Sequence, residues 1–295
     1  MPITDGADHA QRAEPEVLRY AAFSADPSGG NPAGVVLDAG RMTPEQMLAT
    51  AADVGFSETA FLVAREGSVD VRYFSPLAEV SFCGHATVAS AVAHAERHGP
   101  CTLLFRTQAG PVEVLTERSP DGGWQATLTS VPPRTVDLAP DDLARLMSAL
   151  RWSPDDLDPA LPPRTAYAGA WHPVLAARSR ERLADLDYDL PALAELMRLR
   201  GWTTVDLVWR ESALVFSARN PFPPGGVVED PATGAAAAAL GGYLRDGGHV
   251  DPPATVVVQQ GHDVGRPSRL VVDVPAAPGS GIRVTGAAVR LPAGP

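Results

Sequence analysis

The feature of this sequence that most restricts its fold is a motif that occurs twice, 150 positions apart. Residues 78–86 align with residues 228–236, so that Glu79 matches Glu229 and Gly84 matches Gly234. Both copies follow a strand-like run and lead into an alanine-rich stretch of helical character. Because the offset is about half of the 295 residues, the pattern predicts two copies of one supersecondary unit and a chain of two pseudo-symmetric halves.

Local patterns predict a mixture of strands and helices. A capping pattern, Thr43-Pro44-Glu45-Gln46, opens a helix that runs towards Val54, and a second helix runs from Gly84 to about His98, where Gly99-Pro100 stops it. Apolar or alternating runs closed by Gly, Pro or Asp predict strands in the first half at 17–23, 34–37, 59–63, 69–74, 102–106 and 111–116.

The same patterns suggest a domain division. Residues 1–15 are polar and predict a disordered tail, residues 16–130 form the N-terminal half, and residues 131–281 form the C-terminal half. The Pro-rich stretch 131–134 is the predicted linker. A strand at about 282–292 is a candidate to return to the N-terminal half and pair there. We expect the active site in the cleft between the two halves.

Charge and composition exclude several classes of protein. The net charge of −11 opposes nucleic acid and anionic membrane as partners, because phosphate groups attract clustered positive charge. The sequence contains no lysine, which excludes a pyridoxal phosphate Schiff base, a P-loop and a kinase active site. The composition is otherwise that of a folded globular protein, with 45% hydrophobic residues.

Cysteine and histidine usage predicts no metal. The two cysteines, Cys83 and Cys101, form no CxxC pair, so neither a disulfide framework nor a zinc site is expected. His94 and His98 have the spacing of two zinc ligands on a helix, but the glutamate of that zinc motif is missing, and polar residues at a helix C-terminus explain them better. The N-terminal residues contain no apolar leader or anchor, so the expected location is the reducing cytoplasm.

The two glycine loops are candidate binding sites. A helix that begins at glycine presents free backbone N–H groups and the positive end of its dipole, which suit a carboxylate or a developing oxyanion. Two such helix starts, at Gly84 and Gly234, could face one cleft. The structural alternative is that these glycines only allow close packing of helix and strand.

The sequence resembles the phenazine-biosynthesis PhzF family, which is related to diaminopimelate epimerase and proline racemase. The blocks that carry the resemblance are Gly30-Asn31-Pro32-Ala33-Gly34-Val35, Gly55-Phe56-Ser57-Glu58-Thr59-Ala60-Phe61, Phe82-Cys83-Gly84-His85-Ala86-Thr87, Glu229-Asp230-Pro231-Ala232-Thr233-Gly234 and Gly265-Arg266-Pro267-Ser268. The resemblance implies an α+β chain with the diaminopimelate epimerase-like fold, in which each half is a curled β-sheet or barrel around a central α-helix. It also implies a homodimer that uses no cofactor and acts on a small-molecule carboxylate in secondary metabolism.

The resemblance places general acid/base catalysis on Glu58. The related epimerases use two thiols on opposite faces of a carbon, but the partner of Cys83 by the offset is Thr233, whose hydroxyl is too weakly acidic to replace a thiolate. A two-thiol racemase is therefore excluded, and Cys83 is interpreted as a small buried residue. A carboxylate at the mouth of an apolar cleft can take and return a proton near neutral pH, and Glu58 matches the family's catalytic glutamate. The alternative for Glu58 is a solvated residue at a strand end.

The resemblance assigns the remaining site residues to substrate binding. His85 and Asp230 hold the substrate and tune Glu58, while Gly84 and Gly234 supply backbone amides. The structural alternative for Asp230 is that its side chain caps the N-terminus of the helix that follows, and this role can coexist with substrate binding. The family usually has serine where this chain has Ala235, a departure that removes a substrate-contacting hydroxyl and argues against the unchanged phenazine precursor.

Two further segments are open to interpretation. Residues 29–34 lack the spacing of a nucleotide-binding loop and are interpreted as a turn that carries Asn31 near the cleft. Trp171-His172 can line the cleft or pack in the core.

The resulting hypothesis is a cofactor-independent isomerase of the trans-2,3-dihydro-3-hydroxyanthranilate isomerase type, in which Glu58 moves a proton on a small cyclic amino- or hydroxy-carboxylate. One alternative is a single-base epimerase or lyase on the same fold. The other is a non-catalytic metabolite-binding protein, which the loss of the serine at Ala235 would favour and which the presence of Glu58, His85 and Asp230 opposes.

Overall fold

Eight strands close into a barrel around one helix in the first half of the chain. The computed structural model describes residues 15–292, so residues 1–14 of the predicted tail lie outside the described residues. In the first half the elements are β1 (Leu18–Ala22), β2 (Asn31–Val36), α1 (Pro44–Val54), β3 (Glu58–Arg65), β4 (Ser68–Phe74), β5 (Glu79–Val80), α2 (Gly84–His98), β6 (Thr102–Thr107), β7 (Gly110–Arg118), β8 (Trp124–Thr129) and, from the end of the chain, β17 (Arg283–Arg290).

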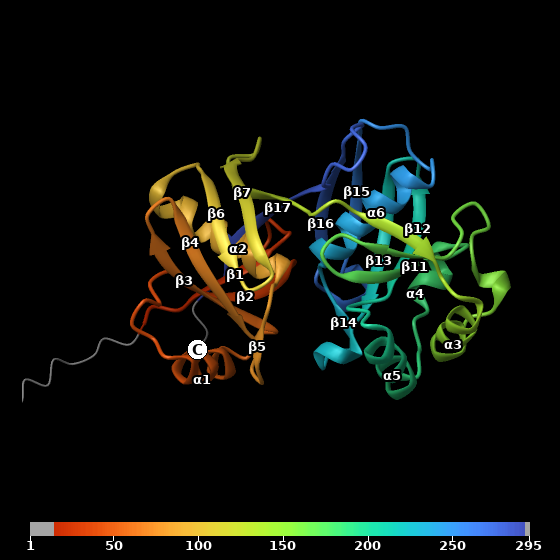
Figure 1. The fold of residues 1–295 in the computed structure, drawn as a ribbon, viewed down its shortest axis with the longest axis horizontal. Helices are drawn as coiled ribbons and strands as arrows, with labels where there is room; N and C mark the ends of the chain where they lie inside the picture. The colour runs from red at the N-terminus through yellow and green to blue at the C-terminus, as the bar shows by residue number, and fades with distance from the viewer. Residues whose placement is uncertain (1–14, 293–295) are drawn as a thin grey trace, which may run out of the picture.

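The second half repeats this design. It contains β9 (Arg134–Asp137), α3 (Pro140–Leu150), η1 (Pro154–Asp156), β10 (Arg164–Tyr167), β11 (Trp171–Ala176), α4 (Arg180–Ala184), α5 (Leu190–Arg200), β12 (Asp206–Ser212), β13 (Val215–Pro221), η2 (Pro223–Gly225), β14 (Glu229–Asp230), α6 (Gly234–Asp246), β15 (Ala254–Gln260), η3 (His262–Val264) and β16 (Ser268–Val274). Figure 1 shows the two halves side by side, with β17 crossing back to the first half.

Strand pairing closes the barrel and joins the halves. The barrel order is β1, β2, β3, β4, β6, β7, β8 and β17, and β17 pairs with β1 to complete the ring. Two pairs are parallel, β2 with β3 and β4 with β6, and the second half has the equivalent parallel pairs β11 with β12 and β13 with β15. Because β17 also pairs with β16, one strand connects the two sheets.

The helices α2 and α6 occupy equivalent central positions. Each connects two parallel strands, and ten residues of each helix are buried. Small side chains are required there because the surrounding strands leave little room. A Cβ on Gly242 of α6 would lie 2.4 Å from the Pro133 side chain, and one on Gly241 would lie 2.9 Å from Val272. The predicted α+β fold of two pseudo-symmetric halves is confirmed.

The helix α1 follows its sequence prediction closely. Thr43 caps it in a capping box with Gln46, a proline occupies the first turn, and Gly55 ends it in the left-handed conformation. Met47 and Ala51 bury one face of α1 against Phe61 and Phe74, whose rings pack edge to face at 5.6 Å.

The strand β2 begins earlier than predicted. The interpretation of residues 29–34 as one turn is wrong for residues 31–34, all of which pair with β1, while Ala33 and Gly34 also pair with β3. Pro32 and Gly34 hid this strand, because both residue types are rare inside sheets. Gly34 is needed here, since a Cβ would stand 2.5 Å from the Thr59 hydroxyl on β3. The turn itself is formed at Gly30, whose φ is +69°.

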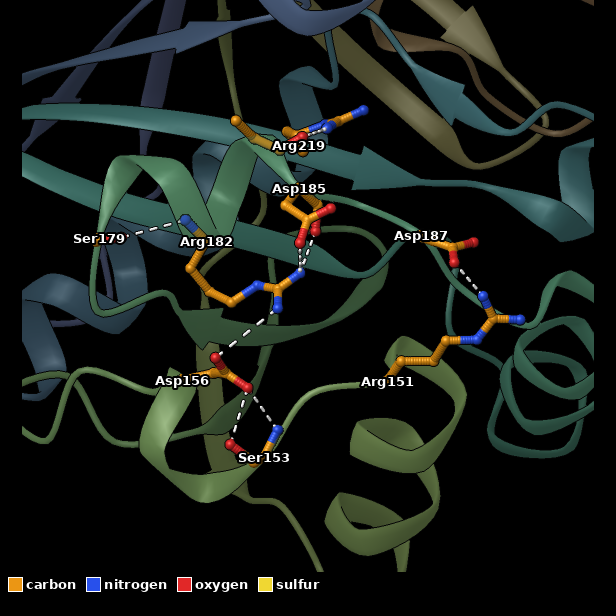
Figure 2. Close-up of polar contacts among 9 residues, drawn as sticks. Arg151, Ser153, Asp156, Ser179, Arg182, Asp185, Asp187 and Arg219 are labelled. Carbon is orange, nitrogen blue, oxygen red and sulfur yellow. Dashed lines mark hydrogen bonds and ion pairs between the residues drawn. The ribbon is translucent and has the colours of Figure 1, made fainter.

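A layer of helices covers the outer face of the second sheet. Leu146 and Leu150 of α3 pack with Leu196 of α5 against Leu207 of β12. Figure 2 shows the ion pairs at the edge of this layer, where Arg182 lies between Asp156 and Asp185 and Arg151 pairs with Asp187. Within residues 15–292, none of the helices is long and apolar enough to cross a membrane.

Each half contains one ion pair between its two-residue strand and the neighbouring long strand. Arg72 of β4 donates two hydrogen bonds to Glu79 of β5, and Arg219 of β13 donates two to Glu229 of β14. The environments differ. The first pair is partly exposed, whereas the Arg219 and Glu229 side chains are 9% and 1% exposed.

We expect the two ion pairs to differ in their effect on stability. Arg219→Met leaves Glu229 buried without its partner and should lower the free energy of unfolding by about 3–5 kcal/mol. Arg72→Met, the matched control in the exposed copy, should cost about 1 kcal/mol or less. Urea denaturation of both variants measures the difference, and equal losses would contradict the assigned role of burial.

Candidate active site

The two copies of the repeated motif meet face to face. The helices α2 and α6 both begin at the glycine of the motif, and a Cβ built on Gly84 would lie 3.9 Å from the Cα of Gly234. Neither helix has a side-chain hydrogen bond at its N-cap, Cys83 or Thr233. Two helix starts with uncapped first turns therefore point towards one region, where backbone amides and both dipoles favour negative charge.

Glu58 lies at this meeting point. It is the first residue of β3, where the chain emerges from the turn after α1, and its register partner on β2 is Ala33. Its side chain is 14% exposed, and its Oε2 lies 3.4 Å from His85 Nε2. Ser57 Oγ lies at the same distance from that nitrogen, so the imidazole has two oxygen neighbours from the start of β3.

His85 links Glu58 to a buried thiol. It is the second residue of α2 and is 6% exposed, and its Nδ1 lies 3.3 Å from Cys83 Sγ. Burial raises the pKa of the Cys83 thiol well above its usual value, and the charges of Glu58 and Asp230 raise it further. Cys83 is therefore a protonated thiol near neutral pH, in agreement with the predicted small buried residue.

Asp230 approaches from the second half. Its Oδ1 accepts a hydrogen bond of 2.7 Å from Asn31 Nδ2, and its Oδ2 accepts one of 2.6 Å from the Thr233 hydroxyl. Burial raises the pKa of Asp230 and the charge of Glu58 adds to the rise, while His85 and the two hydrogen bonds oppose it. The Asp230 carboxyl group therefore interacts electrostatically with both Glu58 and His85, although it comes from the second half of the chain.

Asn31 is the side chain that ties the halves together at this point. Besides Asp230 it donates to the carbonyl of Ala232 at 3.1 Å. The adjacent turn is held in the same way, because Gly30 donates to the carbonyl of Pro267 and Arg266 donates to the carbonyl of Gly30. Three of the sequence blocks that carry the resemblance are thus in contact, because residues 30–35 bond to both of the blocks from the second half.

Sequence reasoning missed two residues that fix this loop. Gln260, the last residue of β15, donates to the Asp230 carbonyl at 2.7 Å and accepts from the Thr233 amide at 3.0 Å. The sequence interpretation treats Thr233 only as the position of a missing thiol, but its hydroxyl donates a hydrogen bond to Asp230. A glutamine before Gly261 at a strand end was the available signal, and it is too common to be informative.

Among the other sequence candidates, the histidines lie away from this meeting point, whereas Ala235 lies beside it. His172 is fully buried in β11 and hydrogen bonds through Nδ1 to Thr204, which donates to Asn220, so it belongs to a polar network inside the second half. His94 and His98 stack with ring centroids 4.4 Å apart near the end of α2. Ala235, in the first turn of α6, is partly exposed.

The arrangement suits proton transfer. One carboxylate, one imidazole and one thiol come from the first half, and a second carboxylate comes from the other. Glu58, Cys83 and His85 also offer oxygen, sulfur and nitrogen atoms within 4.8 Å of one another, so among residues 15–292 these three residues are the group that could hold a metal ion.

Comparisons with known proteins agree with this fold. The sequence model described as "PhzC-PhzF: Phenazine biosynthesis-like protein" matches residues 20–294. A protein of Deinococcus radiodurans named an uncharacterized isomerase is 36% identical, with 88% of this chain and 87% of that protein covered. Trans-2,3-dihydro-3-hydroxyanthranilate isomerase of Pseudomonas fluorescens is 31% identical, with 84% and 86% covered.

A solved structure shows the same architecture. The PhzF-family phenazine biosynthesis protein of Bacillus anthracis superposes with a TM-score of 0.83 at 26% identity, covering 94% of this chain and 96% of that one. These matches confirm both the predicted fold and the prediction that the chain is an isomerase.

The two cysteines should differ sharply in reactivity. Cys83 is buried with a raised pKa, whereas Cys101 is half-buried at the start of β6. We expect iodoacetamide at pH 8 to modify Cys101 at least about tenfold faster, because the thiolate is the reacting form. Mass spectrometry of the two peptides measures this, and equal rates would contradict the environment described for Cys83.

The buried network of the second half predicts a pH effect on stability. Burial raises the pKa of Asp206 to about 7, although Asn220 donates a hydrogen bond to it. Between about pH 4 and 7 the folded protein keeps a proton that the unfolded chain has lost, so this group lowers stability as pH rises. His172, whose pKa burial lowers to about 4, acts in the opposite direction.

Asp206→Asn should therefore gain stability relative to the natural protein as pH rises from 4 to 7. The slope of the difference is at most about 1.4 kcal/mol per pH unit, and the His172 contribution cancels because both proteins contain it. Denaturant titrations across this range test the expectation. A difference that is independent of pH would contradict it.

Proposed function

Because the chain belongs to the PhzC-PhzF family of phenazine biosynthesis-like proteins, as its sequence blocks predicted, we propose that it is a cofactor-independent isomerase acting on a small cyclic amino- or hydroxy-carboxylate. Glu58 takes a proton from one ring carbon and returns it to another on the same face while the double bond shifts, so substrate and product have the same composition. A substrate of the trans-2,3-dihydro-3-hydroxyanthranilate type is proposed from the relative that bears this name.

The observation that carries the proposal is the position of the Glu58 carboxylate. It contacts His85 at 3.4 Å, remains 14% exposed, and lies where the two helix starts converge. A general base must reach a bound substrate and must be held in a fixed orientation, and Glu58 meets both conditions.

His85 and Asp230 are proposed to orient the substrate and to tune Glu58. His85 is confined between Glu58 and Cys83, and Asp230 is confined by Asn31 and Thr233, so neither side chain can turn freely. Groups fixed in this way lower the entropic cost of reaching a reactive geometry.

The substrate carboxylate is proposed to lie at the starts of α2 and α6. The first-turn amides after Gly84 and Gly234 have no side-chain cap that would compete with a ligand. An anion there interacts favourably with both helix dipoles. It would also place the ring between the halves, beside Glu58.

The opposite side of the site favours one base rather than two. Thr233 lies where a two-thiol epimerase has its second cysteine, and its hydroxyl already donates to Asp230 at 2.6 Å. It cannot abstract a proton from carbon, which favours a shift on one face over epimerisation. Ala235 in the first turn of α6 offers no hydroxyl to a ligand, so we propose a substrate related to the phenazine precursor but recognised with one contact fewer.

The cytoplasmic location, the homodimer and the role in secondary metabolism implied by the family are part of the same proposal. The division of the chain into residues 16–130 and 131–281, with catalysis in the cleft between them, also belongs to it. The contacts of Asn31 with Asp230 and Ala232 favour a site shared by both halves.

The proposal is tested by incubating the protein with trans-2,3-dihydro-3-hydroxyanthranilate in D₂O while absorbance and deuterium incorporation are followed. We expect conversion with label from solvent, and Glu58→Gln should reduce the rate by at least about 10²-fold, because the amide keeps the shape but cannot carry the proton. Glu113→Gln, a change at an exposed residue of β7 in the same barrel, is the matched control.

Two results would separate the alternatives. Full activity of Glu58→Gln on this or another cyclic carboxylate would exclude the assigned shuttle. Conversion by the natural protein without any solvent label has two explanations, because Glu58 can also return the same proton that it removed. Substrate deuterated at the exchanging carbon separates them. Deuterium found at the other ring carbon of the product fits the shuttle, and deuterium that stays at its original carbon contradicts it.

A further inference from the structure

His85 and two neighbouring side chains offer atoms that can bind a metal ion, a property on which the proton-transfer proposal does not depend. In the part of the chain that the structure describes, Glu58, Cys83 and His85 are the group of histidine, cysteine and acidic side chains whose ligand atoms lie within 4.8 Å of one another. They combine a carboxylate oxygen, a sulfur and an imidazole nitrogen, three donor types that zinc accepts together.

The distances match those of a tetrahedral ion. Zinc bonds of about 2.3 Å to sulfur and about 2.0 Å to nitrogen and oxygen place the S and N ligands about 3.5 Å apart and the N and O ligands about 3.3 Å apart. The observed separations are 3.8 Å from Cys83 Sγ to His85 Nε2 and 3.4 Å from His85 Nε2 to Glu58 Oε2. The Cys83 sulfur and a Glu58 carboxylate oxygen also lie within 4.8 Å of each other. Two of the three ligand separations are therefore within a few tenths of an ångström of those around a tetrahedral ion.

The carboxylates beside the three ligands favour a cation, whereas the two helix starts oppose one. Cys83 and His85 are buried and Glu58 is nearly so, and the second carboxylate, Asp230, acts on the same group. A divalent ion would balance this negative charge and would displace the thiol proton to solvent as the Cys83 sulfur binds. The fourth position would be open for water, as in zinc sites that are not fully enclosed by protein ligands.

We propose that Glu58, Cys83 and His85 form a binding site for a thiophilic divalent ion such as Zn²⁺ and that the bound ion blocks catalysis. The ion binds the Glu58 carboxylate and the His85 imidazole, which are the groups that would otherwise move and direct the proton. The inhibitory half of this inference rests on the proposed function, whereas the metal site itself does not.

The chain offers a matched control, because Cys101 is its other cysteine. The intact protein is titrated with Cd²⁺, a spectroscopic probe for thiolate ligation, and the ultraviolet charge-transfer absorbance is recorded. We expect one equivalent to bind through one thiolate, Cys83→Ser to abolish the absorbance, and Cys101→Ser to leave it unchanged. Glu58→Gln, which preserves side-chain volume, should keep the absorbance and weaken binding at least about tenfold.

The outcomes distinguish this inference from the proposed function. Absorbance that survives Cys83→Ser, or that is lost in Cys101→Ser, would overturn the metal site whatever the enzyme's activity. If Cys83→Ser does not fold, unchanged Cd²⁺ affinity in Glu58→Gln overturns it instead. Zn²⁺ should also inhibit the isomerisation catalysed by the Cys101→Ser variant and by the natural protein to the same extent, and a chelator should reverse the inhibition of both. Binding without inhibition would remove the inhibitory half alone.

Discussion

The close approach of two helix starts is the constraint on which the rest of the structure depends. Gly84 and Gly234 stand almost in contact, so α2 and α6 must each lie at the centre of its own half and point at the other. That requirement explains why both helices are built from small residues and why strands wrap around them. It also leaves two sets of backbone amides in one place, which no single half could provide.

The charged side chains of the site follow from this arrangement. Glu58 and His85 come from the first half, Asp230 comes from the second, and Asn31 crosses between them through its bond to Asp230. Three ionisable groups that influence one another are thus assembled from distant parts of the chain. Burial disfavours negative charge on Asp230 and Cys83, whereas the Glu58 side chain keeps an exposed edge, and for this reason Glu58 is the group proposed to exchange protons with a ligand.

Local sequence information predicted the parts of this structure that depend on local rules. The capping box of α1 and the glycine starts of α2 and α6 are encoded within a few residues, and the structure places them as expected. Strand β2 was partly missed because Pro32 and Gly34 oppose strand formation, and only its pairing with two neighbours reveals it. Gln260 could not be found, because its role depends on contacts with a loop 27 to 30 positions away.

The central claim is that both helix starts and Glu58 form a single site shared by the halves. A crystal structure of the protein with a cyclic carboxylate bound tests it most directly. The account predicts the ligand carboxylate at the amides after Gly84 and Gly234, with a ring carbon within about 3.5 Å of a Glu58 oxygen. A ligand bound within one half, out of reach of Glu58, would contradict it.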